Sequence, residues 1–436
     1  MSQRSKQGAM NLASQTTAKQ RFIILATILG NSLEWFDFIL FGMMAPFFIS
    51  LFFPESLRHS SYLFPTLMAI VAIARPIGGF IFGTMGDKKG RKFALVRTIC
   101  FMIIPLFLAA LLPSYEKIGI TAAFLFIFMF FLQGISLGGE FPGAVVFLIE
   151  SAKKETLGYI GSFAYFGIFI GIFFAMVEVL LFNTEITPEG LRAGEWRLPF
   201  LLSGMVGVVI LVLRRLLRET PFFEEAKHYG FLLKEPLFDT FHKYKKALFV
   251  GIGLMIMDTV GFNLVLLYSP FYYTSVLNLS YFHSTLLQFF TIFLFLVTIL
   301  FAGKLADSIG IRRFAKWVLW ILFSVAAPIY ILMGWKIYWL LFFTQGVLAV
   351  LIASYFSVLP VLVSSLFPIE VRYSGTATAM NLAIAIFGGI GPFIMVLVIG
   401  RFQTPLWPIL YLMVGCALSI LSLSHVHNPK RSIAKM

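Results

Sequence analysis

The sequence is poor in charged residues and in cysteine. Only 12% of its 436 residues are Asp, Glu, Lys or Arg, whereas 59% are hydrophobic. A soluble protein needs far more polar surface than this composition supplies, so soluble classes are excluded. The two cysteines, Cys100 and Cys416, both fall inside long apolar runs. Their number and position exclude a disulfide framework and a thiolate metal site.

Signatures of catalysis are missing as well. We find no Walker-type phosphate loop, no metal-ligand spacing and no nucleophile beside a suitable base, and the six histidines are scattered. The sequence therefore predicts that the protein is not an enzyme and holds no cofactor or metal. Without an ATP-binding loop, any work it performs must draw on an ion gradient.

What the chain has instead is a series of long hydrophobic runs. Runs of about 20 residues match the thickness of the hydrocarbon layer of a bilayer. The sequence predicts an all-α polytopic membrane protein with twelve spans, at 22–50, 62–85, 93–112, 119–149, 157–182, 198–217, 247–274, 283–303, 314–334, 337–366, 373–399 and 405–424. The net charge of +14 is explained if most Lys and Arg face the cytoplasm. We therefore expect both termini in the cytoplasm and no nucleic-acid partner.

A short hydrophilic string joins two of these runs and returns, degenerate, in the second half. It reads GTMGDKKGRK at 83–92 and GKLADSIGIRR at 303–313. Such a repeat indicates the tandem duplication of a membrane unit. We predict a cytoplasmic tail at 1–21, a six-helix bundle at 22–217, a cytoplasmic linker at 218–246, a second six-helix bundle at 247–424 and a cytoplasmic tail at 425–436.

The linker contains an amphipathic run at 222–233. Two placements stay open for this run. It can lie on the inner membrane surface, with its apolar face in the lipid, or it can be part of a solvated connection.

Three longer stretches carry a family resemblance. They are GNSLEWFDFILFGMMAPFF from Gly30, ARPIGGFIFGTMGDKKGRK from Ala74 and QGISLGGEFPGAVVFLIE from Gln133. With the repeated loop, they resemble the metabolite:proton symporter branch of the major facilitator superfamily, and the resemblance extends along essentially the whole chain. The segment 151–158 departs from it, because it lacks the Pro and Arg that this family usually has there.

The resemblance implies the twelve-helix major facilitator fold, two six-helix pseudo-repeats in a bacterial inner membrane. It also implies proton-coupled import of a small organic acid or zwitterion, of the dicarboxylate or proline/betaine type, by alternating access. We expect a monomer whose partners are the lipid bilayer and a small-molecule substrate. Sodium would suit buried carboxylates almost as well as protons. A proton-coupled efflux transporter of the same fold is the alternative function, although the run 157–182 lacks the Gly-Pro motif usual in exporters.

Several ionisable residues lie inside the apolar runs, where each costs roughly 2.5–3.5 kcal/mol. Counting about 1.5 Å per residue from the helix ends places Glu34, Arg75, Glu140 and Asp258 near the bilayer midplane, with Asp37 one turn beyond Glu34. Arg75 is the only base that we place there. We expect it to bind a substrate carboxylate in competition with these acids, which would couple substrate to proton. A structural ion pair within the first half is the alternative, and the acid that carries the proton stays open.

The face of Asp258 continues through Tyr268 and Tyr272 at helical spacing. Pro270 predicts a helix break near the external end. The tyrosines can therefore close over a bound solute, or they can belong to an interfacial aromatic belt.

The family resemblance also implies a cytoplasmic gate. In it, an acid of each repeated loop caps a helix of the opposite half, where free N–H groups and the helix dipole attract a carboxylate. Basic residues after that acid are expected beside a glutamate. The expected gate residues are Asp87, Arg91 and Glu150 in the first half, and Asp307, Arg312 (or Arg313), Glu370 and Arg372 in the second. The alternative role for these charges is to signal topology.

Overall fold

The computed structural model describes residues 3–58, 63–185, 194–389 and 406–426. The first-half helices are α1 (Gln3–Met43) with its continuation α2 (Ala45–Phe52), α4 (Leu63–Lys89), α5 (Arg91–Leu111), α7 (Ile120–Ser151), α8 (Leu157–Glu185) and α10 (Arg197–Arg215). The second-half helices are α13 (Lys245–Phe262), α15 (Tyr281–Ile309), α16 (Ile311–Met333), α17 (Tyr338–Ser364), α18 (Arg372–Ala383) and α20 (Leu406–Ser424). Short helices are α3 (Glu55–Arg58), α6 (Tyr115–Ile118), α11 (Pro221–His228) and α12 (Pro236–His242).

The prediction of an all-α membrane protein is confirmed. In the described part of the chain, 11 helices are long and apolar enough to cross a membrane. The remaining predicted span, 373–399, begins with α18 and then runs beyond the described residues. Helix α1 starts well before the predicted boundary at residue 22, because the preceding residues include Ala, Gln, Lys and Met, which favour helix.

The helix break expected at Pro270 is wrong. After α13 the chain continues through a π-helical segment η2 (Asn263–Tyr268), one α-turn α14 (Ser269–Phe271) and a second π segment η3 (Tyr272–Val276). These segments form one apolar span, Lys245–Val276. Wider π-turns let the backbone pass the missing N–H of Pro270 without ending the helix.

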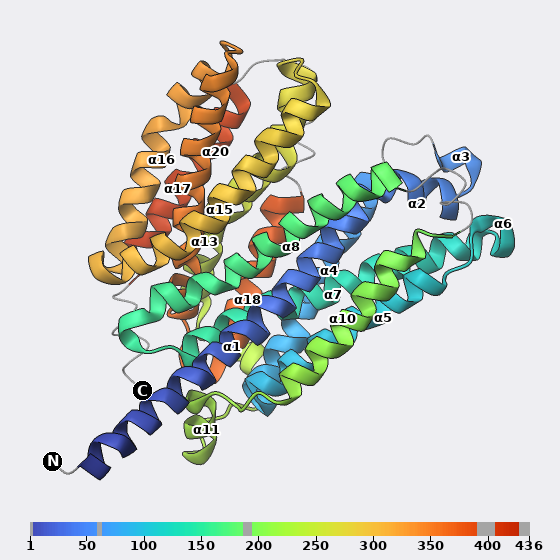
Figure 1. Ribbon diagram of the computed structural model, residues 1–436. Coiled ribbons are helices and arrows are strands. Elements are labelled where there is room, and N and C mark those ends of the chain that lie inside the picture. Colours follow the sequence, from blue (N-terminus) through green and yellow to red (C-terminus); the bar gives the residue numbers. More distant parts are fainter. Residues whose placement is uncertain (1–2, 59–62, 186–193, 390–405, 427–436) are drawn as a thin grey trace.

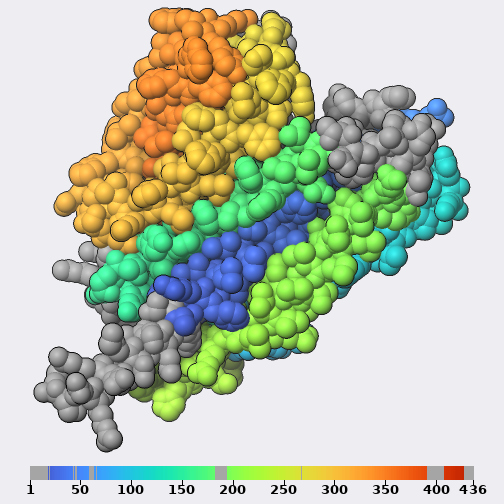
Figure 2. Space-filling model, in the orientation of Figure 1, coloured from blue at the N-terminus to red at the C-terminus, as the bar shows by residue number. Residues whose placement is uncertain are grey.

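Two bundles make up the molecule (Figure 1), and they meet along two pairs of helices, α4 with α18 and α8 with α15. Figure 2 shows the face on which α8 lies along α15. Gly79 and Gly83 of α4 face α18, and a Cβ added at Gly83 would lie 2.8 Å from the Cα of Ser374. Small residues therefore let these two backbones approach closely across the junction.

One end of the bundle carries the segment that joins the two halves. Helix α11 lies at this end, where α1 also begins (Figure 1). The end of α20 belongs here too, because Arg312 at the start of α16 donates to the carbonyl of Ser424 at 2.9 Å. We call this end the linker end.

Candidate functional site

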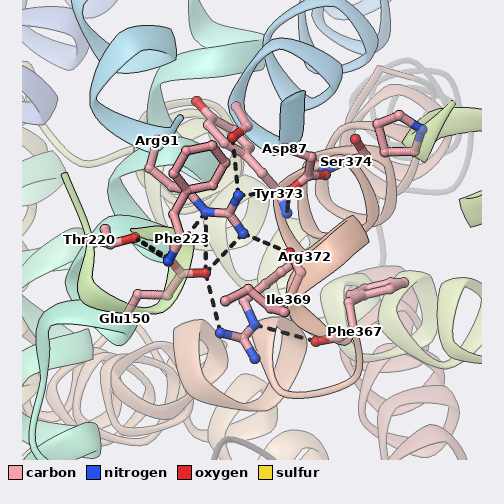
Figure 3. Close-up of polar contacts among 12 residues, drawn as sticks. Asp87, Arg91, Glu150, Thr220, Phe223, Phe367, Ile369, Arg372, Tyr373 and Ser374 are labelled. Carbon is pink, nitrogen blue, oxygen red and sulfur yellow. Dashed lines mark hydrogen bonds and ion pairs between the residues drawn. The ribbon is translucent and has the colours of Figure 1, made fainter. Parts of the chain in front are cut away.

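Charged side chains of both halves meet at the linker end (Figure 3). Arg91 donates hydrogen bonds to both carboxylate oxygens of Glu150. The Nε–Oε2 and Nη2–Oε1 distances are both 3.1 Å. Arg372, from the second half, donates to the same carboxylate at 3.2 Å. Arg91 also donates to the carbonyl of Ile369 at 2.7 Å. All three charged side chains are buried, so one carboxylate joins two arginines of different halves.

Two aspartates cap helices across the junction. The carboxylate of Asp87 accepts hydrogen bonds from the backbone N–H groups of Tyr373 (3.1 Å) and Ser374 (2.8 Å), in the first turn of α18. The carboxylate of Asp307 accepts from Gly158 and Tyr159, both at 2.9 Å, in the first turn of α8. Each repeated loop thus satisfies free N–H groups at the start of a helix in the opposite half.

The second repeat does not reproduce the arginine–glutamate pair. Arg312 is exposed and bonds to the end of α20, and Arg372 turns to Glu150 of the first half. Glu370 is half-buried, and its Oε2 has no partner among the described residues. The reason lies in the sequence, because Ile311 follows Gly310 where Arg91 follows Gly90. Glu370 and Arg312 therefore form no second copy of this contact.

The start of the linker is docked on this cluster. Glu219 accepts from the backbone N–H groups of Arg91 and Lys92, both at 3.1 Å, and so caps α5. Thr220 donates to Glu150 at 2.6 Å and accepts from the backbone N–H of Phe223 to begin α11. Burial raises the pKa of Glu219 above its usual value. Phe223, at the start of the run 222–233, is buried with its ring 5.0 Å from the guanidinium of Arg91, whereas Tyr229 and Phe231 further along are exposed. The lipid-surface and solvated placements of the run both stay predictions.

Arg75 lies at the junction between the halves. It is buried, and its Nε donates to Oδ1 of Asn381 on α18 at 3.4 Å. Its Nη2 has no hydrogen-bond partner in the described chain. The ring of Trp35 on α1 lies 6.0 Å from the guanidinium, and its own Nε1 is also unpartnered there. Buried donors are rarely left unsatisfied, so this pair is suited to an acceptor that is not part of the chain.

Two carboxylates lie near Arg75, and within the described part of the chain neither forms a direct ion pair with it. Asp258 of α13 accepts from the hydroxyl of Tyr165 of α8 at 2.6 Å, which joins the halves. Glu34 of α1 accepts from Ser136 of α7 at 3.4 Å, and its other oxygen has no partner among the described residues. Both carboxylates lie within electrostatic reach of Arg75. The structure thus brings Glu34, Arg75 and Asp258 together, as expected.

Glu140 faces a different base. Arg214, in the last turn of α10, forms a bidentate pair with it, with Nη1–Oε2 at 2.6 Å, and Thr98 donates to the same carboxylate at 2.6 Å. The expectation that Arg75 is the only intramembrane base is therefore wrong. Arg214 reaches inward from the helix end because Gly30 leaves room for its guanidinium.

The remaining predicted residues lie outside this group. Asp37 is buried beside Ser203 of α10, and neither of its oxygens has a well-formed hydrogen bond in the described chain. Tyr268 and Tyr272 stack with ring centroids 5.4 Å apart, and Tyr272 also contacts Tyr330 of α16. These tyrosines form a buried cluster of the second half, 10 and 14 residues along the chain from Asp258.

Comparison with known proteins identifies the family of the chain. Residues 22–230 match the sugar (and other) transporter family. The chain is 33% identical to a glycine betaine/proline/ectoine/pipecolic acid transporter of Dickeya dadantii, over 92% of this chain and 82% of that one. It is 32% identical to a proline/betaine transporter of Escherichia coli, over 93% and 83%. The chain belongs to the major facilitator superfamily, in its metabolite:proton symporter branch.

Solved structures show the same fold. A double-tryptophan mutant of XylE superposes with a TM-score of 0.75 at 17% identity, covering 97% of this chain and 99% of that one. The proton:xylose symporter XylE bound to 6-bromo-6-deoxy-D-glucose gives 0.72 at 18% identity, covering 94% and 95%. The twelve-helix major facilitator fold is therefore confirmed. The protein is a secondary transporter and not an enzyme.

Proposed function

We propose that this protein imports a small zwitterionic metabolite together with protons across a bacterial inner membrane, with the linker end in the cytoplasm. The observation that carries the proposal is Arg75, a buried arginine between the halves with an unpartnered nitrogen and a carboxylate on either side. Sites of secondary transporters lie at the interface of the repeats, where Arg75 contacts Asn381 of the other half.

A zwitterion fits this arrangement better than a dianion. Its carboxylate can accept from Arg75 Nη2 and Trp35 Nε1, the two unpartnered donors. Its cationic nitrogen can face Asp258 and the aromatic pair of Trp35 and Phe262, whose rings lie 5.0 Å apart across the junction. Proline and betaine, named for the relatives, each carry one carboxylate and one cationic nitrogen, which supports this substrate class.

Coupling follows from the competition for one arginine. When the substrate carboxylate binds Arg75, Glu34 or Asp258 loses part of its counter-charge. A buried carboxylate without a counter-charge is costly, so proton uptake by that acid accompanies substrate binding. Sodium could serve the same acids with oxygen ligands. Glu140 takes no direct part in this step, because Arg214 neutralises it.

The linker-end contacts act as the gate in this proposal. The caps made by Asp87 and Asp307, with the Arg91–Glu150–Arg372 cluster, close the cytoplasmic side. Opening that side breaks these contacts as the bundles 22–217 and 247–424 rock about the linker 218–246. A single chain contains all these parts, so a monomer suffices.

Uptake into proteoliposomes tests the proposal. We would offer labelled proline, glycine betaine, 2-oxoglutarate, citrate and shikimate under an inward proton gradient, with and without sodium. We expect a zwitterion to accumulate without sodium, a protonophore to abolish its accumulation, and Arg75→Ala to lose it. Arg97→Ala, at an exposed arginine of α5, is the matched control and should transport normally. Accumulation that needs only sodium, favours a dicarboxylate or survives in Arg75→Ala would contradict the proposal.

A further inference from the structure

Tyr373 of α18 crosses the junction and enters the first half at the linker end (Figure 3). Its side chain is completely buried, and its hydroxyl donates to the carbonyl of Gly139 on α7 at 2.9 Å. Its backbone N–H is one of the two capped by Asp87. The ring is therefore held at both ends by residues of the opposite half.

The slot for this ring is made of glycines. A Cβ added at Gly86 of α4 would overlap the ring of Tyr373, and one added at Gly143 of α7 would overlap its hydroxyl end. Since interiors pack without spare volume, any larger residue at either position would displace the ring. The slot and its occupant belong to different halves, so they separate when the halves rock apart.

A buried charged pair lies near the ring. Gly139, which accepts the hydroxyl, precedes Glu140, and Tyr373 is within electrostatic reach of both Glu140 and Arg214. Tyr373 is also within electrostatic reach of Asp87 and Arg91 of the gate. Glu140 and Arg214 in turn act electrostatically on Glu34. Tyr373 thus lies within electrostatic reach of both the linker-end cluster and the Glu140–Arg214 pair, which in turn acts on Glu34.

We propose that Tyr373 is the plug that keeps linker-end water away from the Glu140–Arg214 pair and Glu34 while the gate is closed. The inference rests on the proposed proton coupling. The backbone N–H of Tyr373 donates to Asp87, so breaking this cap lets the ring leave the slot beside Gly86 and Gly143. Water can then enter the slot. Proton release toward the linker end is then possible only when the gate opens. Tyr373 is a positioning residue in this step, since it touches neither substrate nor Arg75.

Proton leakage without substrate tests the plug. The assay uses proteoliposomes that contain a pH-sensitive dye. Potassium and valinomycin fix the membrane potential, a proton gradient is imposed, and the dye reports the leak directly. We expect Tyr373→Ala to dissipate the gradient several-fold faster than the parent protein. Gly143→Ala, which fills the slot from the other side, should leak as well. Tyr373→Phe keeps the ring and should leak little.

The matched control is Tyr411→Ala, which removes a tyrosine whose hydroxyl bonds stay within the second half. It should be as tight as the parent protein. Counterflow of substrate, which needs no net proton release, should persist in Tyr373→Ala. The inference would be overturned if Tyr373→Ala and Gly143→Ala both leaked protons no faster than the parent protein. If Tyr373→Ala does not fold, Gly143→Ala alone decides, and a tight Gly143→Ala variant overturns it.

The same vesicles keep the two proposals apart. Substrate-driven proton entry in the parent protein reports on proton coupling, whereas the leak of the variants is measured with no substrate present. If substrate drives no proton entry in the parent protein but the variants still leak, the proposed function is wrong. Tyr373 then remains a barrier to protons. Normal coupling with tight variants counts against the plug alone.

Discussion

The cap that Asp87 makes on α18 offers a quantitative test of the gate. Replacing Asp87 by Asn removes the charge and leaves only one oxygen to accept from the N–H groups of Tyr373 and Ser374. A hydrogen bond to a charged group contributes about 1.5–3 kcal/mol, and the interaction with the helix dipole adds about 0.3–1 kcal/mol. We expect the closed linker end to lose about 2–3 kcal/mol, which is roughly a 30- to 150-fold shift toward the open form.

Distances between spin labels measure this shift. Cysteines at Lys88 and Lys316, two exposed positions in different halves, carry the labels in a background without Cys100 and Cys416. Asp87→Asn should populate a longer distance between the labels, whereas Glu155→Gln, at an exposed acid of the same end, should not. An unchanged distance distribution in Asp87→Asn would refute the reasoning that this cap holds the halves together.

Three further predictions concern the same end of the molecule. Asp307→Asn should open this end by a similar amount, because it removes the equivalent cap on α8. In the double variant Asp87→Asn with Asp307→Asn, the free-energy losses of the two single variants should add. The same label pair measures both effects. Glu150→Gln leaves two buried arginines without their shared counter-charge, which should lower the free energy of unfolding by about 3–5 kcal/mol. Its midpoint of thermal unfolding in detergent should therefore fall further than that of Thr220→Val. Burial raises the pKa of Glu219, so the docked linker binds a proton more readily than the undocked one. Docking is therefore strongest at acidic pH and weakens as pH rises through the raised pKa. Hydrogen exchange of 218–229, corrected for the intrinsic rate, should be slower at pH 5.5 than at pH 7.5, and Glu219→Gln should abolish the difference.

The sequence predicted the membrane fold well because hydrophobic run length and the repeated loop are local signals. The family resemblance implied the caps of Asp87 and Asp307, and the apolar context singled out Glu34, Arg75 and Asp258 as candidates. The charges in an apolar context and the repeat itself are visible in a single chain, whereas the capping role of the two aspartates came from the resemblance.

Other parts of the site left no such signal. Arg214 ends a helix beside Arg215, where a base looks like an ordinary membrane-flanking residue, and only the third dimension shows that it turns inward to Glu140. Thr220 and Glu219 belong to a hydrophilic linker whose docking depends on α5 and α7. Asn381 and Tyr373 are uncharged, and their partners are more than 200 residues away in the sequence. Contacts between the halves cannot be read from periodicity within one helix.

The central claim is that movement of a zwitterion and movement of protons are one process that depends on Arg75. The most direct measurement imposes an inward gradient of the accumulated zwitterion on proteoliposomes at equal pH and follows the pH inside. The account predicts acidification of the lumen that starts with substrate addition, is lost in Arg75→Ala and persists in Arg97→Ala. Substrate entry with no change of internal pH in the parent protein would contradict it.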